Sequence, residues 1–272
     1  MERLPEVRAG DADRESATDA QELLELAREA AYAAGGLLRE RFEAGRERRI
    51  ASKSTPTDPV SEADLASQRT IHAMIAQRRP ADAFLAEEEG ADEAGSSGLR
   101  WVVDPLDGTV NFLYGIPQWS VSVAVRDEHG ALVGVVHDPM AGETFTAVRG
   151  TLPARNGVAL PSRAADAPPL SQSLIATGFA YEAEARAEQG AVVARLLPAV
   201  RDIRRLGSAA LDLCGTAMGR FDAYFERGVK AWDTTAGALV CSCVDLTVRP
   251  IPEGILVAPP SLVDELESII LT

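Results

Sequence analysis

Three groups of acidic residues stand directly beside short apolar runs in this sequence. Glu87–Glu89 follows the apolar FLA, Asp104 and Asp107 follow WVV, and Asp233 follows Trp232. Carboxylates supply oxygen ligands, and hard cations such as Mg²⁺ take one or two carboxylates each together with several waters. These residue types at these positions therefore indicate a metal site, and with it metal-assisted chemistry.

Asp104 and Asp107 are the most informative pair. They lie in DPLDGT, with Pro105 between them and Gly108 after them, a composition that predicts a tight turn rather than a strand. Such a turn directs both carboxylates and an intervening carbonyl at one spot. The backbone N–H groups that follow the turn are free to meet a phosphate oxygen, and the Thr109 hydroxyl is placed to orient a metal-bound water.

Each acidic residue also has an ordinary structural explanation. Asp-Pro and Asp-Gly are common in turns, and a run such as Glu87–Glu89 is usually a solvated charged face. Asp233 or Asp64 alone would be explained as a helix cap or its partner. Only the combination of the clusters favours a metal site over these alternatives.

The hydrophobic pattern predicts the elements that position these clusters in the first half of the chain. Apolar residues at helical spacing predict a helix over 20–42, and Ser61 opens a second helix with Asp64 in capping-box spacing. Apolar runs at 84–86 and 101–103 predict short strands. Residues 120–148 predict an antiparallel meander, because apolar stretches there are separated by turn-like residues.

Strands and helices alternate beyond a Pro- and Ala-rich loop over 153–169. The predicted strands are SLIATG, DIRRL, DAYFE and ILVAP, and the predicted helices are 184–197, 208–218, 234–244 and 261–271. We therefore expect a disordered tail over 1–18, an N-terminal α+β domain with the metal site over 19–152, and a C-terminal α/β domain over 153–272 that completes the substrate pocket.

Composition excludes several classes of protein. The 272 residues include 41 acidic and 27 basic side chains, a formal net charge of −14, which argues against direct nucleic-acid binding. An anionic substrate would be repelled as well, unless bound divalent cations reverse the local field. No apolar stretch is long enough to span a membrane, and the charged N-terminus does not resemble a signal peptide.

The cysteines and histidines supply no alternative site. Cys214, Cys241 and Cys243 form no disulfide framework, are best explained as buried thiols, and suit a cytoplasmic location. The three histidines, His72, His129 and His137, all lie away from the acidic motifs, which argues against Ser-His-Asp or phosphohistidine chemistry.

Five segments carry a resemblance to a known family. FLAEEEG, WVVDPLDGTVNFLYGIP, FERGVKAWDTTAGAL, SKSTPTDPVSEAD and GSAALDLCGTAMGRFDAYFE together cover roughly residues 50–240. They resemble the inositol monophosphatase family, and most of all the bacterial inositol-1-monophosphatases. The resemblance implies an α+β fold, a layered αβαβα sandwich, usually assembled as a homodimer and often inhibited by Li⁺.

The resemblance also implies the metal ligands and the catalytic residues. Two or three Mg²⁺ per site would be bound by Glu87, Asp104, the Leu106 carbonyl, Asp107 and Asp233. Glu87 and Thr109 would activate the attacking water, with Asp64 supporting them through a hydrogen bond.

The remaining implied residues would bind the substrate. The amides of Gly108 and Thr109 would hold the phosphate, and Lys53 would lie in a mobile loop that closes over the metals. The inositol pocket would be lined by Gly207, Ser208, Ala209 and Glu226.

The function expected from this resemblance is Mg²⁺-dependent hydrolysis of myo-inositol 1-phosphate by direct attack of a metal-activated water. Related enzymes act on histidinol phosphate, fructose 1,6-bisphosphate or 3′-phosphoadenosine 5′-phosphate, and these substrates stay open. A second possibility is a non-catalytic role as a protein partner, because some bacterial relatives are linked to the transcription machinery.

The chain departs from the family pattern in two places. Ala86 stands where many members have Gly, and the segment after Val240 is shortened and lacks the usual glycines. The second departure puts the C-terminal sheet edge in doubt, together with anything that it contributes to dimerisation or to the pocket rim.

Overall fold

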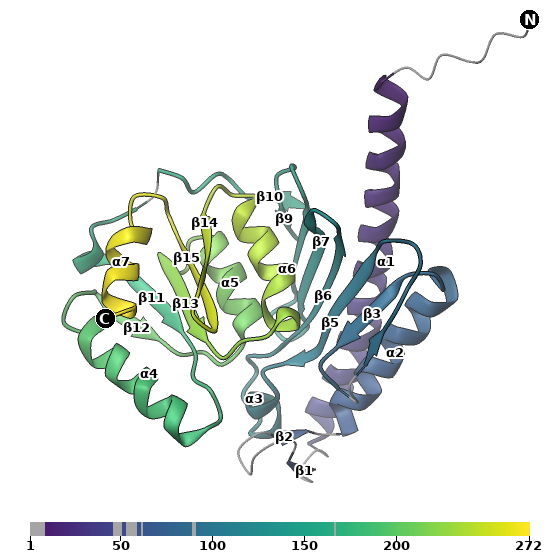
Figure 1. The fold of residues 1–272 in the computed structure, drawn as a ribbon. Helices are drawn as coiled ribbons and strands as arrows, with labels where there is room; N and C mark the ends of the chain where they lie inside the picture. The colour runs from purple at the N-terminus through teal and green to yellow at the C-terminus, as the bar shows by residue number, and fades with distance from the viewer. Residues whose placement is uncertain (1–8, 46–50, 53–58, 61, 89–90, 166) are drawn as a thin grey trace, which may run out of the picture.

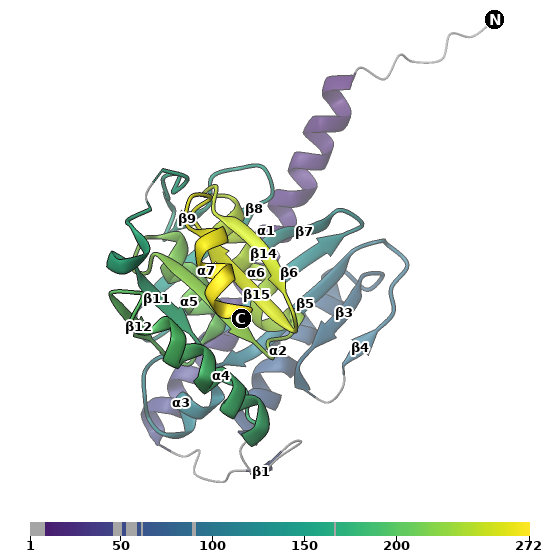
Figure 2. The same cartoon turned by 60° about the vertical axis from the view of Figure 1, so that its left-hand side comes forward.

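Helices and sheets alternate in five layers, which Figures 1 and 2 show from two sides. The computed structural model describes residues 9–45, 51–52, 59–60, 62–88, 91–165 and 167–272. Helices α1 (Ala9–Ala44) and α2 (Glu62–Arg78) form one outer layer, α5 (Ala209–Ala217) and α6 (Ala231–Ser242) form the middle layer, and α4 (Ala183–Leu196) and α7 (Val263–Ile270) form the other outer layer. The predicted αβαβα sandwich is confirmed.

The first sheet, here called the N-terminal sheet, has eight strands in the order β10-β9-β8-β7-β6-β5-β3-β4. Their bounds are β3 Ala83–Ala86, β4 Asp92–Glu93, β5 Arg100–Asp107, β6 Ser120–Asp127, β7 Gly130–Asp138, β8 Glu143–Val148, β9 Ala154–Arg155 and β10 Val158–Ala159. Strands β6, β7 and β8 pair in antiparallel fashion, as the meander over 120–148 predicted.

The second sheet, here called the C-terminal sheet, has the order β12-β11-β13-β15-β14. Its strands are β11 Leu174–Thr177, β12 Asp202–Arg204, β13 Ala223–Arg227, β14 Thr247–Ile251 and β15 Gly254–Ala258. The short elements are the pair β1 (Ala51–Ser52) and β2 (Pro59–Val60), the helix α3 (Thr109–Leu113) and the 3₁₀ turn Leu170–Gln172.

Side chains along each strand point alternately to the two faces of the sheet, so the interior is divided into distinct hydrophobic cores. On β5, Trp101 and Val103 pack in the core with α1 and α2, whereas Val102 lies in the core shared with α5 and α6. On β15, Leu256 packs towards α4 and α7, while Val257 faces the middle layer. Because successive side chains of a strand point to opposite faces, each apolar strand supplies two cores at once.

The structure departs from the predicted elements near both ends of the chain. Residues 9–18, expected within a disordered tail, are the first turns of α1; extending a formed helix costs far less than nucleating one, and residues 1–8 lie outside the described residues. In the C-terminal half, β14 forms a hairpin with β15 through a two-residue turn, where Glu253 has φ 59°. The sequence predicted only the second of these two strands.

The division into two domains stays a prediction. The hairpin of β9 and β10 pairs with β8, so the N-terminal sheet continues to Ala159, a few residues beyond the expected boundary at 152. The middle helices α5 and α6 pack against both sheets.

Candidate active site

The DPLD segment forms an irregular end of strand β5 rather than the tight turn predicted from its composition. Asp104 pairs with Ser122 and Asp107 with Ser120, so β5 advances three residues while β6 advances two. The extra residue makes a β-bulge, and Pro105, which has no N–H to donate, is tolerated there. The Leu106 amide donates to Asp104 Oδ1 at 3.0 Å, which fixes the first carboxylate.

Asp107 is held by the N-terminus of helix α5. Its carboxylate accepts hydrogen bonds from the Ser208 hydroxyl at 2.5 Å and from the amides of Ala210 at 2.8 Å and Ala209 at 3.2 Å. Helix N-termini favour anions because their first amides have no partner within the helix. Ser208 and Ala209, predicted to line the substrate pocket, thus direct these groups at Asp107.

Thr109 and Asp64 meet across the sequence. The Thr109 hydroxyl donates towards Asp64 Oδ1 at 3.0 Å and towards the Leu106 carbonyl at 3.1 Å. Both Asp64, in the first turn of α2, and Thr109, the first residue of α3, are buried. Ser61, the predicted helix opener, and Lys53, the predicted mobile-loop residue, lie outside the described residues.

Gly108 and Gly207 bring two loops into close contact. Gly108 has φ 96°, and a Cβ there would lie 2.9 Å from the Gln118 carbonyl and 3.2 Å from the Gly207 carbonyl. As Gly108 is also the N-cap of α3, no side chain caps the first amides of that helix. Asn111 fixes this approach, donating to the carbonyls of Gln118 at 2.7 Å and Leu206 at 2.8 Å.

Asp233 lies inside the first turn of α6 rather than before it. The helix begins at Ala231, and the Asp233 carboxylate accepts a hydrogen bond from the Lys230 amide at 2.5 Å. The predicted helix start at Thr234 was therefore late, because the propensities of neighbouring residues do not separate a cap from the first turn.

The acidic residues share one electrostatic environment. Burial raises the pKa of Asp104 well above its usual value, with Glu87, Asp107 and Asp233 adding to the rise. Burial and then Glu87 raise the pKa of Asp233 in the same way. Burial also raises the pKa of Asp107 to about 6, against the lowering effect of its hydrogen bonds from Ser208, Ala210 and Ala209.

This donor set fits a hard cation in its chemistry. The groups are carboxylate and carbonyl oxygens, which Mg²⁺ prefers, and the cost of holding like charges together in a buried site falls when a cation joins them. Among the described residues, no group of three or more His, Cys, Asp or Glu lies close enough together to hold a metal ion. The fit to a hard cation therefore rests on donor type and on the shared electrostatic environment.

Glu226 lies beside this cluster, near the end of β13. Its carboxylate accepts a hydrogen bond from the buried Tyr224 hydroxyl at 2.8 Å. Burial raises the pKa of Glu226 to about 7, and the Asp107 charge contributes to the rise whereas the Tyr224 hydrogen bond opposes it. Gly178 leaves room for this carboxylate, since a Cβ there would lie 2.1 Å from it.

Sequence reasoning missed Tyr224, Asn111 and Ser120. Tyr224 could have been found, because residues two apart on a strand share a face and Glu226 had been singled out. Ser120 faces Asp107 only because β6 returns beside β5. Asn111 contacts a loop 95 residues away in sequence, so local spacing gives no signal for it.

Comparison with known proteins gives a consistent family. Residues 19–244 match the model of the inositol monophosphatase family. An inositol-1-monophosphatase of Mycobacterium leprae is 43% identical over 232 residues, 80% of this chain and 79% of that protein. A Pasteurella multocida protein named Nus factor SuhB is 42% identical over 219 residues, 80% of this chain and 81% of that one.

The fold is also shared with a solved structure. The extragenic suppressor protein suhB of Bartonella henselae superposes with a TM-score of 0.85 at 30% identity, covering 92% of this chain and 98% of that one.

None of the described helices combines the length and apolar composition that a bilayer span requires.

Proposed function

This chain belongs to the inositol monophosphatase family, and we propose that it is a Mg²⁺-dependent phosphatase that hydrolyses myo-inositol 1-phosphate to inositol and phosphate. The observation that carries the proposal is the buried Thr109–Asp64 hydrogen bond beside the carboxylates of Asp104 and Asp107. It combines a group that orients water with a donor set that suits a hard cation.

The Thr109 hydroxyl orients the attacking water in this proposal. Its single hydrogen is directed at Asp64 or at the Leu106 carbonyl, so the lone pairs of its oxygen stay available as acceptors. A water that donates to Thr109 would turn its own lone pair towards the phosphorus. Glu87, whose charge acts on Asp104 and Asp233, would take the second proton of that water.

The phosphate and the polyol are recognised by different groups. The amides of Gly108 and Thr109 would meet the phosphate oxygens, because they lie at the start of helix α3, where backbone N–H groups have no partner within the helix. Glu226 would accept hydrogen bonds from ring hydroxyls, alongside Gly207 at the pocket wall. Mg²⁺, when bound by Glu87, Asp104, Leu106, Asp107 and Asp233, would neutralise charge on the phosphate and lower the pKa of water.

Assembly and inhibition are part of the same proposal. By the family resemblance, the protein would act as a homodimer in the cytoplasm and would be inhibited by Li⁺. Lys53 would close a loop over the bound metals. Two or three Mg²⁺ per site are expected, and together they would stabilise charge on the phosphate and on the leaving oxygen.

The test is phosphate release from a panel of esters under Mg²⁺ titration. The panel contains inositol 1-phosphate, histidinol phosphate, fructose 1,6-bisphosphate and 3′-phosphoadenosine 5′-phosphate. We expect the highest kcat/KM for inositol 1-phosphate, loss of activity on chelation, and a fall in kcat of at least about a hundredfold in Asp104→Asn. If no ester is hydrolysed, the phosphatase proposal is wrong; if another ester is preferred, only the substrate is wrong.

A relative named Nus factor SuhB supports a second candidate, a role as a protein partner that does not need catalysis. The same Asp104→Asn variant separates the two candidates. If the variant no longer releases phosphate but still supports the function of this protein in the cell, the protein-binding role is favoured. If the variant loses both, the phosphatase is favoured.

A further inference from the structure

Glu226 is fixed from both faces of the C-terminal sheet. Tyr224 and Glu226 lie two residues apart on β13, so both face the middle layer, and Tyr224 packs there in the core with α5 and α6. Phe225 lies between them in sequence and packs on the opposite face, towards α4. Residues packed on either face of the sheet can therefore act on the position of Glu226.

On the inner face, the Tyr224 hydroxyl orients the carboxylate directly. It donates to Glu226 Oε2 at 2.8 Å, and the tyrosine ring is fully buried. A buried ring has no freedom to follow a rotating carboxylate, so this bond selects one orientation. The bond uses part of the acceptor capacity of Oε2 and leaves Oε1 for other donors.

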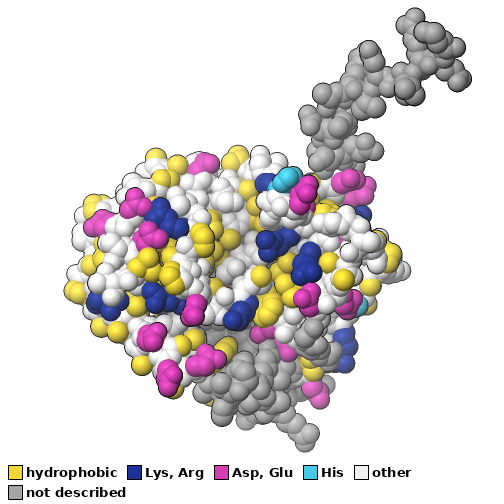
Figure 3. All heavy atoms as spheres, viewed as in Figure 1, with side chains coloured by type: hydrophobic (Ala, Val, Ile, Leu, Met, Phe, Trp, Pro, Cys, Tyr) yellow, Lys and Arg dark blue, Asp and Glu magenta, His cyan; other side chains and the backbone are white. Residues whose placement is uncertain are grey.

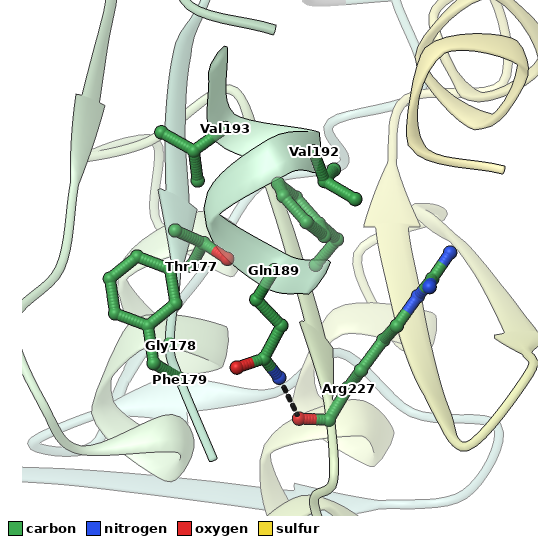
Figure 4. A pocket seen from close by; sticks show the side chains of 8 residues that line it. Thr177, Gly178, Phe179, Gln189, Val192, Val193 and Arg227 are labelled. Carbon is green, nitrogen blue, oxygen red and sulfur yellow. Dashed lines mark hydrogen bonds between the residues drawn. The ribbon is translucent and has the colours of Figure 1, made fainter. Parts of the chain in front are cut away.

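On the outer face, Gln189 of α4 joins the ends of the parallel strands β11 and β13; Figure 4 shows its bond to Arg227. Its Oε1 accepts from the Ala180 amide at 2.9 Å, and its Nε2 donates to the Arg227 carbonyl at 3.0 Å. Ala180 follows Gly178 at the exit of β11, and Arg227 follows Glu226 at the end of β13. Gln189 therefore fixes the spacing between Gly178 and Glu226.

That spacing has little tolerance. A Cβ on Gly178 would lie 2.1 Å from the Cδ and from both carboxylate oxygens of Glu226, so the carboxylate lies directly against the Gly178 backbone. The cavity between Gln189, Gly178 and Arg227 measures about 10 Å³, room for about one water. A shift of either strand end would therefore move the carboxylate.

We propose that Tyr224 and Gln189 are positioning residues that hold the Glu226 carboxylate against Gly178 in one orientation, and so set the preference of the site for phosphate esters whose leaving group carries ring hydroxyls. The inference rests on the proposed function, because it assigns Glu226 to the leaving group. Fixed acceptors reject ligands that lack the matching donors, since a buried acceptor is then left unpaired.

The test compares two esters with Mg²⁺ present, inositol 1-phosphate and phenyl phosphate, whose leaving group has no ring hydroxyls. The variants are Tyr224→Phe, which removes one hydroxyl, and Gln189→Glu, which keeps the acceptor for Ala180 and removes the donor to Arg227. Glu226→Gln serves as the reference for loss of the carboxylate. Tyr32→Phe, on the half-exposed Tyr32 of α1, is the matched control.

We expect the ratio of kcat/KM for inositol 1-phosphate over phenyl phosphate to fall about tenfold in Tyr224→Phe, mainly through a higher KM for the inositol ester, because hydrogen bonds to charged groups are among the stronger ones. Gln189→Glu should lower the ratio in the same direction, and Tyr32→Phe should keep it. Should Gln189→Glu not fold, Tyr224→Phe decides alone.

The inference is overturned if Tyr224→Phe keeps the wild-type ratio while Glu226→Gln lowers it; the proposed function would then stand. Equal falls in kcat/KM for both esters would also overturn it, since that result marks a general structural defect. If the wild-type protein hydrolyses neither ester, the proposed function itself fails and the inference fails with it.

Discussion

Asp82 and Asp212 are two enclosed carboxyl groups that differ in the hydrogen bonds that they accept. Asp82 accepts from the Arg79 guanidinium and from the Trp101 indole, and these bonds hold its pKa below the usual value although burial opposes them. Asp212 of α5 is also buried, but its Oδ1 has no hydrogen-bond partner in the described structure. Burial raises the pKa of Asp212 well above the usual value, and Glu226 and Asp107 add to the rise.

We predict opposite effects on stability for two equivalent substitutions. The folded state keeps the Asp212 proton to a higher pH than the unfolded chain does, so the stability of the wild type falls as the pH rises above about 4. Asp212→Asn should remove this penalty and raise the Tm at neutral pH by about 2–4 °C. Asp82→Asn should lower the Tm. A carboxyl group whose pKa is lowered by folding stabilises the folded state at every pH above its pKa in the unfolded chain, and the substitution removes that contribution. Thermal melts between pH 5 and 8 measure both, and a lower Tm in Asp212→Asn would contradict the assignment.

At the scale of elements, helix α5 organises the candidate metal site. The N-terminus of α5 lies against the bulged end of β5, and Ser208 acts twice, as the N-cap that accepts from Leu211 and as a donor to Asp107. A residue of the middle layer thus orients a proposed metal ligand of the N-terminal sheet. Groups that orient metal ligands are typically worth 10–100-fold in metal affinity.

Ser208→Ala should therefore raise the Mg²⁺ concentration for half-maximal activity about tenfold. The substitution removes a hydrogen bond that lowers the pKa of Asp107, so more of this carboxyl is protonated at neutral pH and fewer ligands are ready for the metal. Activity against Mg²⁺ concentration measures the effect. Ser173→Ala, at a buried serine that bonds the Pro169 carbonyl, controls for the loss of a buried hydroxyl. An unchanged Mg²⁺ requirement in Ser208→Ala would contradict the role.

At the scale of the whole molecule, the carboxylates of this chain, whose net charge is −14, occupy contrasting environments. On the face that Figure 3 shows, acidic and basic side chains are interspersed, as expected for a solvated surface. Asp104 and Asp107 are buried, and Asp233 is half-buried, where β5, α5 and α6 meet. Burial and the neighbouring negative charges raise the pKa of each of these carboxyl groups. A cation bound at this junction would join the N-terminal sheet to the middle layer.

Removal of Mg²⁺ should therefore lower the Tm, and more so at higher pH. Without the ion, these carboxyl groups have raised pKa values, so the folded state binds more protons than the unfolded chain does. The stability of the fold therefore falls as the pH rises from about 4 through about 6, the pKa of Asp107. Mg²⁺ binding stabilises the folded state by mass action. The Tm difference between Mg²⁺ and EDTA should be larger at pH 8 than at pH 5, and an equal or smaller difference at pH 8 would contradict this explanation.

Periodicity and turn composition were sufficient to predict most elements. The apolar strands over 84–86 and 101–103 and the helix capped by Ser208 have their signals within a few residues. The sequence was less informative where a signal depends on a neighbour. Asp104 and Asp107 were assigned to a turn, because nothing local reveals that β6 continues to pair with β5 through the bulge.

By itself, the sequence determined which residue types are available for chemistry and, through its motifs, the family and the layered fold that the family implies. The tertiary structure decided how those residues are held. Asp107 is fixed by an α5 amide 103 residues away, and Glu226 is confined by Gly178 and by strand ends that Gln189 joins. The physical reason is that hydrogen bonding and close packing depend on distance in space, whereas periodicity reports only on neighbours in the chain.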